Sequence, residues 1–219
     1  MPVYKLSKKS ILFPPGPLAD YDGLLAFGGD LSVRRLVNAY SNGIFPWYNP
    51  GEEILWWCPH KRFVIFPQEI HISRSTKKIL ARGEFETKFN TNFPDIIGGC
   101  RALREGDTWL GDDMQAAFLT LFDAGYVLCV GVYNGGQLVG GLYGVAIGRC
   151  FFGESMFSLA PNASKIALIR LCHSLAEKNF AFVDCQFHTP HLEKMGGRYI
   201  FWEEYRRLLR MNITEQGGA

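Results

Sequence analysis

Two apolar stretches of this chain each carry polar side chains that could serve acyl transfer. In the first, Glu154 stands among phenylalanine, glycine and methionine residues within the run 151–157. In the second, an apolar segment that begins at Phe182 ends in Asp184, and Gln186 follows two positions later. We predict that the two stretches lie side by side and form one acyl-transfer site. Taken alone, Asp184 or Gln186 would be an ordinary turn residue at a strand end.

The elements that position these residues begin with an antiparallel meander. Residues 126–133 and 137–147 are two strands joined by an Asn-Gly pair, the strongest short hairpin signal. Gly148 starts a second turn into residues 150–152, so Glu154 is expected at the end of a third strand. A helix capped by Asn162 then leads to a strand at residues 181–185.

The sequence before the meander predicts four helices and two short strands. Helical spacing or caps indicate helices at residues 33–41, 73–80, 94–104 and 113–123. Strands are expected at residues 63–66 and 85–89. The first 60 residues combine turn-forming sequence with three tryptophans, and they indicate a small separate lobe.

This order of elements resembles the GNAT-like acyltransferase fold. In that fold the strands before and after the central helix are neighbours that splay apart, which places Glu154 and Asp184 in one cleft. The predicted class is therefore α+β. We expect a small N-terminal α/β domain at residues 1–60, followed by a GNAT-like acyltransferase domain at residues 61–219 with a mixed, mainly antiparallel sheet.

The loop before the central helix argues against coenzyme A as the acyl donor. A coenzyme A enzyme of this fold carries a glycine-rich loop whose N–H groups bind the pyrophosphate. Residues 158–164 contain no glycine, and Pro161 has no N–H to donate. We therefore expect a different donor.

Charge and cysteine usage narrow the class of protein. The net charge is only +2, but the segment from His60 to Arg82 is basic, which fits either RNA binding or a solvated helix face. Six cysteines are scattered without metal-binding spacing, so we expect no metal site. Neither a signal peptide nor a membrane-spanning run is evident, and a reduced cytoplasmic protein is the expectation.

Several long motifs resemble the bacterial leucyl/phenylalanyl-tRNA–protein transferases. The likeness runs from about residue 10 to about residue 200. The motifs that carry it are Phe13-Pro14 and residues 23–32, 43–47, 56–59, 71–75, 153–158, 162–165 and 183–186. This set of motifs is specific to that family.

The resemblance implies an enzyme that moves leucine or phenylalanine, and methionine less readily, from aminoacyl-tRNA to proteins that begin with Lys or Arg. The product is an N-degron that is read by proteolysis. The family uses no cofactor and no metal, and we expect a monomer without membrane contact. Because the aminoacyl ester is already activated, the reaction needs no ATP.

Site roles also follow from the resemblance. Proton handling falls to Asp184 and Gln186, and Glu154 supplies negative charge for the cationic N-terminus of the acceptor. The aminoacyl pocket would be lined by Leu142, Phe151, Met156, Leu171 and Val183, most of which could equally be core. Trp47 and Trp109 would stack on the terminal adenosine. Phosphates of the acceptor stem would contact Arg74, Lys77, Lys78 and Arg82.

Two other interpretations of the sequence stay open. A coenzyme A-dependent N-acetyltransferase shares the fold, and adding acetyl-CoA with a peptide tests it. A tRNA-binding module without catalysis would keep the basic run and the tryptophans. Such a module would have no need of Glu154, Asp184 and Gln186 together.

Overall fold

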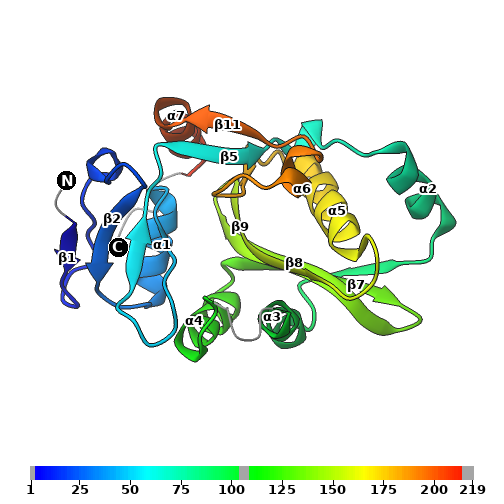
Figure 1. The fold of residues 1–219 in the computed structure, drawn as a ribbon, viewed down its shortest axis with the longest axis horizontal. Coiled ribbons are helices and arrows are strands. Elements are labelled where there is room, and N and C mark those ends of the chain that lie inside the picture. Colours follow the sequence, from blue (N-terminus) through cyan, green and yellow to red (C-terminus); the bar gives the residue numbers. More distant parts are fainter. Residues whose placement is uncertain (1–2, 104–108, 214–219) are drawn as a thin grey trace.

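The computed structural model describes residues 3–103 and 109–213, which form two β-sheets flanked by helices (Figure 1). The strands are β1 (Tyr4–Leu6), β2 (Leu24–Gly28), β3 (Phe45–Pro46), β4 (Leu55–Trp57), β5 (Lys61–Ile65), β6 (Glu86–Phe89), β7 (Val127–Asn134), β8 (Gln137–Ile147), β9 (Cys150–Ser158), β10 (Phe182–Asp184) and β11 (Arg198–Phe201). The helices are α1 (Val33–Ser41), α2 (Arg74–Arg82), α3 (Phe93–Ala102), α4 (Asp112–Asp123), α5 (Ala163–Glu177), α6 (Pro190–Glu193) and α7 (Trp202–Asn212), with 3-10 turns η1 (Gly16–Leu18) and η2 (Pro67–Glu69).

The larger sheet contains the predicted meander. Its order is β11-β5-β10-β9-β8-β7-β6, and β10 is parallel to β9, whereas the other pairs are antiparallel. Helix α5 connects the parallel pair. This arrangement confirms the predicted α+β class with a mixed, mainly antiparallel sheet and a GNAT-like order of elements.

Two details of the local predictions were wrong. Strand β9 continues to Ser158, because its second half still pairs with β8, so Glu154 lies inside the strand and not at its end. Asn162 precedes α5 in a left-handed conformation, and its side chain makes no capping bond to the helix backbone. Instead, the Ser158 hydroxyl accepts from the backbone N–H of Ser164 at 3.2 Å.

Alternating side chains of the larger sheet pack in two apolar layers. Figure 1 shows α3 and α4 against one face of the sheet and α5 against the other. Leu142 and Phe151 belong to the cluster that contains the buried residues of α5, whereas Tyr143 and Phe152 join the cluster that contains those of α3 and α4. Successive strand residues point to opposite faces, so the two layers follow from the strand sequences.

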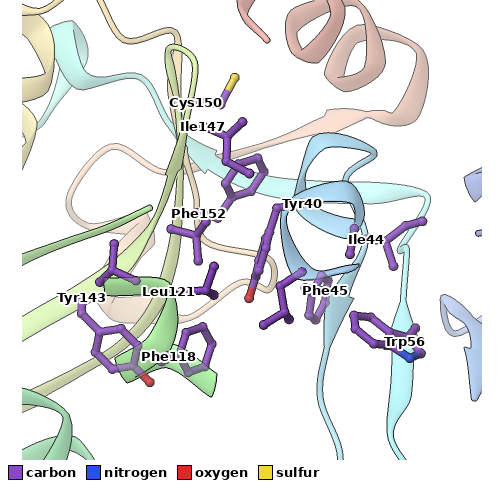
Figure 2. Packing of buried hydrophobic residues seen from close by; sticks show 14 of the residues in the cluster. Tyr40, Ile44, Phe45, Trp56, Phe118, Leu121, Tyr143, Ile147, Cys150 and Phe152 are labelled. Carbon is purple, nitrogen blue, oxygen red and sulfur yellow. The ribbon is translucent and has the colours of Figure 1, made fainter. Parts of the chain in front are cut away.

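The smaller sheet, with the order β1-β2-β4-β3, shares a core with the larger one. Figure 2 shows Tyr40 from the N-terminal part beside Phe152 of β9, with their ring centroids 5.3 Å apart. Helix α7 also packs back onto the N-terminal part, where a Cβ added to Gly43 would lie 2.6 Å from the Tyr205 ring. The change of sheet occurs between β4 and β5, although the apolar core is continuous across it.

Candidate active site

Glu154 occupies a bulge in β9. Ser155 pairs with Tyr143 and Gly153 pairs with Gly144, so Glu154 is the extra residue between two register positions. A bulge bends a strand locally and redirects the side chain that it carries. Beside it, β10 pairs with β9 only as far as the Asp184–Phe152 position, and beyond it β9 pairs with β8 alone. The predicted neighbouring strands therefore pair and then part next to Glu154.

The Glu154 carboxyl receives two hydrogen bonds from other elements. The Tyr40 hydroxyl on α1 donates to Oε1 at 2.9 Å, and Gln186 Nε2 donates to the same oxygen at 3.3 Å. Burial raises the pKa of Glu154 to about 8, and the bonds from Tyr40 and Gln186 oppose that rise. Near pH 7 the neutral form therefore dominates, which differs from the negative charge expected from the resemblance. The physical reason is desolvation, which disfavours the charged form.

This raised pKa makes stability depend on pH. A carboxyl whose folded pKa of about 8 exceeds its ordinary value of 4.5 stabilises the fold fully below pH 4.5 and loses this contribution as pH rises through 8. Glu154→Gln cannot ionise, so its stability relative to the parent should grow over that window. Relative to the parent, the free energy of unfolding of Glu154→Gln should be higher at pH 8 than at pH 4.5 by on the order of 2 kcal/mol. This figure already allows for water in the cavity, which screens the charge. Urea unfolding at both pH values measures it, and a pH-independent difference would contradict the shift.

Asp184 lies beneath the site in a fully buried ion pair. Its carboxylate is 0% exposed and accepts from Arg62 Nη2 at 2.6 Å and from the Tyr205 hydroxyl at 2.6 Å. Arg62 is itself buried between the rings of Phe45 and Tyr205 and donates to the Gly43 carbonyl. A buried pair of this kind persists only when its remaining hydrogen-bonding groups are also satisfied. Asp184 therefore has no free face for a substrate.

Gln186 is held in an unusual backbone conformation by Asp184. Its φ is +57°, in the left-handed region that non-glycine residues seldom adopt. Its backbone N–H donates to Asp184 Oδ1 at 2.8 Å, and its carbonyl accepts from the Phe63 N–H. The strained turn directs the Gln186 amide toward Glu154. Asp184 thus acts on the site through the position of Gln186.

An apolar cavity of about 230 Å³ opens beside Glu154 and Gln186. All five residues expected to hold the aminoacyl side chain line it: Leu142, Phe151, Met156, Leu171 and Val183. They come from β8, β9, β10 and α5, which the fold brings to one face of the sheet. Asp184 points away from this cavity because it follows Val183 in the strand.

Sequence reasoning missed three residues of this network. Tyr40 falls within the helix predicted at residues 33–41 and Tyr205 near the end of the chain, and neither was expected to have a role at the site. Arg62 belongs to the basic run and is expected there as surface charge, but it is buried and paired with Asp184. Its position directly before the apolar run that starts at Phe63 was the available signal.

The two tryptophans lie near the turn that follows β3. Trp47 is 43% exposed and packs against Phe187, which lines the cavity. Trp109 is half-buried against Phe118. Gly111, two residues later, packs against Pro50 in this turn. The segment after Trp109 thus lies beside the segment after Trp47.

The basic residues Arg74, Lys77, Lys78 and Arg82 are all exposed on α2. Figure 1 places α2 at the opposite end of the molecule from β1, with α5 and α6 between it and the smaller sheet. The residues on α2 therefore do not join the Glu154–Gln186 network directly. Within the described ranges, no group of His, Cys, Asp and Glu side chains could hold a metal ion, and no helix is long and apolar enough to cross a membrane.

Known proteins resemble this chain over most of its length. A family model for leucyl/phenylalanyl-tRNA protein transferase matches residues 64–210, and a model for the N-terminal domain of that family matches residues 29–60. The transferase of that name from Syntrophus aciditrophicus is 49% identical over 217 residues, which cover 97% of this chain and 90% of that protein. The one from Thiobacillus denitrificans is 52% identical over 192 residues, which cover 86% and 84%.

Among solved structures, an aminoglycoside acetyltransferase from an uncultured soil metagenomic sample has a TM-score of 0.40 and 12% identity. That match covers 63% of this chain and 95% of that chain. The sequence matches are far closer. On the family models and these relatives, the chain belongs to the leucyl/phenylalanyl-tRNA–protein transferase family, and it is an aminoacyltransferase.

Proposed function

We propose that this enzyme transfers leucine or phenylalanine, and methionine less readily, from aminoacyl-tRNA to the N-terminal α-amine of proteins that begin with Lys or Arg. The product would be an N-degron that marks those proteins for degradation. The observation that carries this proposal is the apolar cavity with Glu154 and Gln186 at its edge. Such a cavity fits an apolar amino-acid side chain whose ester lies beside a proton-accepting group.

The transfer forms one bond and breaks another at the ester carbonyl carbon. The acceptor nitrogen attacks that carbon, the amide forms, and the ester C–O bond breaks so that the ribose oxygen of the tRNA leaves. The α-amine has a pKa of about 8 and must first lose a proton. Glu154, whose pKa is also about 8, is matched to accept it. Glu154 releases this first proton to solvent, and the second proton, which the nitrogen loses as the amide forms, passes to the leaving ribose oxygen.

Gln186 and Asp184 take supporting roles in this mechanism. The Gln186 amide donates to Glu154 and orients the carboxyl that accepts the proton. Asp184 holds the backbone of Gln186 in its left-handed turn and is in turn held by Arg62 and Tyr205. A neutral amide is a poor base, which supports placing the proton on Glu154.

The donor would occupy the cavity and its mouth. The five apolar residues from Leu142 to Val183 would surround the leucine or phenylalanine side chain, and the flexible Met156 would adapt to either shape. Trp47 and Trp109 would stack on the terminal adenosine, where each contact contributes about 1–3 kcal/mol. Residues 1–60 would form a small domain that supplies Trp47 and Tyr40 to the catalytic domain of residues 61–219.

The exposed basic side chains of α2 would bind phosphates of the acceptor stem. Lys77→Ala combined with Lys78→Ala is expected to weaken the binding of tRNA. The slope of the logarithm of the binding constant against the logarithm of the salt concentration should become shallower by about 0.9 for each phosphate that the variant no longer neutralises. Fluorescence titration at several salt concentrations measures the slope. Lys9→Ala with Lys178→Ala removes the same charge elsewhere and serves as the control. Equal slopes for the two double variants would remove α2 from the proposed interface.

One assay tests the proposed activity itself. Labelled leucyl-tRNA or phenylalanyl-tRNA is mixed with the enzyme and with one protein in three versions that begin with Arg, Lys or Ala. Label should enter the first two versions only, without ATP. Transfer to the Ala version at the same rate would overturn the acceptor preference, and transfer from acetyl-CoA would favour an N-acetyltransferase. We further propose that the enzyme works as a monomer in the reducing cytoplasm, where its six cysteines remain free thiols.

A further inference from the structure

A second cavity, of about 350 Å³, lies where the start of α2 meets α5 and α6. Its lining is rich in groups that bind anions, and no carboxylate is among the described residues around it. The polar residues of the lining are Lys165, Lys194, His71, His191, Ser73 and Thr76. We refer to it as the basic cavity.

The two lysines of the basic cavity have no acidic partner in the described chain. Lys165 Nζ donates to the neutral amide oxygen of Asn162 at 3.2 Å, and no ion pair holds Lys194. The nearest carboxylate in sequence, Glu193, contacts His188 instead. Two lysines without an acidic partner therefore line one small cavity, which favours an anion there.

His191 supplies a third group that lacks a partner. Its Nε2 atom is buried and has no hydrogen-bond partner within the described ranges. Burial, together with the charges of Lys165 and Lys194, lowers the pKa of His191, so the ring is neutral near pH 7. A buried polar atom without a partner is unfavourable. Since His191 lines the basic cavity, an oxygen acceptor that reached Nε2 from there would satisfy it as a donor and stabilise the two lysines at the same time.

The basic cavity adjoins the aminoacyl cavity. His191 lines both, and α5 turns Leu168 and Leu171 toward the aminoacyl cavity while Lys165 and Ile169 face the basic cavity. On its other side, the basic cavity reaches Ser73, the residue that caps α2. It therefore lies between the exposed basic surface of α2 and the cavity proposed for the aminoacyl group.

We propose that the basic cavity binds a phosphate group, namely a backbone phosphodiester near the single-stranded 3′ end of the donor RNA. This inference rests on the proposed function, since it assigns a contact for the same donor. Lysine ammonium groups and a histidine N–H match the oxygens of a phosphate. The Ser73 and Thr76 hydroxyls, which bond to each other, line the same cavity. The position between α2 and the aminoacyl cavity favours a phosphate of the RNA chain over free inorganic phosphate.

Kinetics with two donors test the inference separately from the proposed function. Phenylalanyl-tRNA carries backbone phosphates, whereas the phenylalanyl ester of adenosine carries none. Lys165→Gln with Lys194→Gln should raise KM for phenylalanyl-tRNA by about tenfold and leave KM for phenylalanyl-adenosine unchanged. Lys9→Gln with Lys178→Gln, two exposed lysines elsewhere, is the matched control. Unchanged kinetics with phenylalanyl-adenosine also show that the variant is folded.

The outcomes separate the two ideas. If the unmodified enzyme transfers phenylalanine from neither donor, the proposed function fails. If it uses both donors and the lysine variant keeps the same ratio of the two KM values as the control, the phosphate inference fails while the proposed function stands.

NMR of His191 tests the source of the phosphate. Deacylated tRNA should raise the pKa of His191, because a nearby anion stabilises the protonated ring. The effect should disappear in the Lys165→Gln, Lys194→Gln variant. If inorganic phosphate raises the pKa of His191 and tRNA does not, the basic cavity binds free phosphate and the assignment to RNA is overturned. No change with either ligand would reject the site altogether.

Discussion

Arg62→Ala is expected to destabilise the protein by about 3–5 kcal/mol and to reduce transfer activity with it. The substitution leaves the Asp184 carboxylate buried without its cationic partner, since Asp184 is 0% exposed and Tyr205 then remains its only side-chain donor in the described chain. An uncompensated buried charge has a cost of this size. Urea unfolding measures the loss. Lys61→Ala, at the exposed neighbouring position of β5, should change stability by less than about 0.5 kcal/mol.

A paired substitution separates stability from activity at this site. Arg62→Met with Asp184→Leu removes both charges together, and such replacements of a buried ion pair are often neutral or stabilising. The double variant should therefore recover much of the stability lost in Arg62→Ala. Its activity should stay low, because the Gln186 N–H loses the Asp184 oxygen that fixes its left-handed turn. Recovery of both properties would show that Asp184 has no positioning role.

Glu154→Gln is expected to lower kcat/KM by about 10²–10⁴-fold, the usual contribution of a positioned general base. The glutamine side chain has nearly the same shape and can still accept from Tyr40, so the cavity should remain intact. Binding of phenylalanyl-tRNA should change far less than the rate of transfer. Glu177→Gln, a change of the same type at an exposed position of α5, should leave the rate unaltered.

The pH profile supplies a second readout for Glu154. With an acceptor whose amine has a low pKa, only the enzyme titrates, and kcat/KM should rise toward a plateau above pH 8 because the base must be ionised. Glu154→Gln should abolish this rise and leave a flat, low profile. A rise of the same form in the variant would assign the titration to another group and remove Glu154 from the role of base.

The sequence was informative wherever local pattern decides the structure. The Asn-Gly turn fixed the β7–β8 hairpin, and the apolar spacing located α4 and α5 within a few residues. The resemblance to the family named five residues that line one apolar cavity in the structure. Side chains in strands alternate between faces, so once the strands were located, the residues that could face the same layer were limited.

The second half of β9 was less predictable from local pattern. Its pairing with β8 continues past Glu154 through a bulge, and a bulge depends on the register between two strands and not on the residues of one. The length of the strand and the direction of the Glu154 side chain were therefore decided by the partner strand.

The sequence by itself determined the family, the fold class and the two polar stretches around Glu154 and Asp184. Only the tertiary structure separated the environments of these two carboxyls. Arg62 and Tyr205, which lie 122 and 21 positions away in the sequence, bind the Asp184 carboxylate in the core. Among the residues that the structure describes, no cation hydrogen-bonds to Glu154, and burial raises its pKa to about 8. Whether a carboxyl is ionised depends on desolvation and on which charges lie nearby, and these are properties of the folded chain.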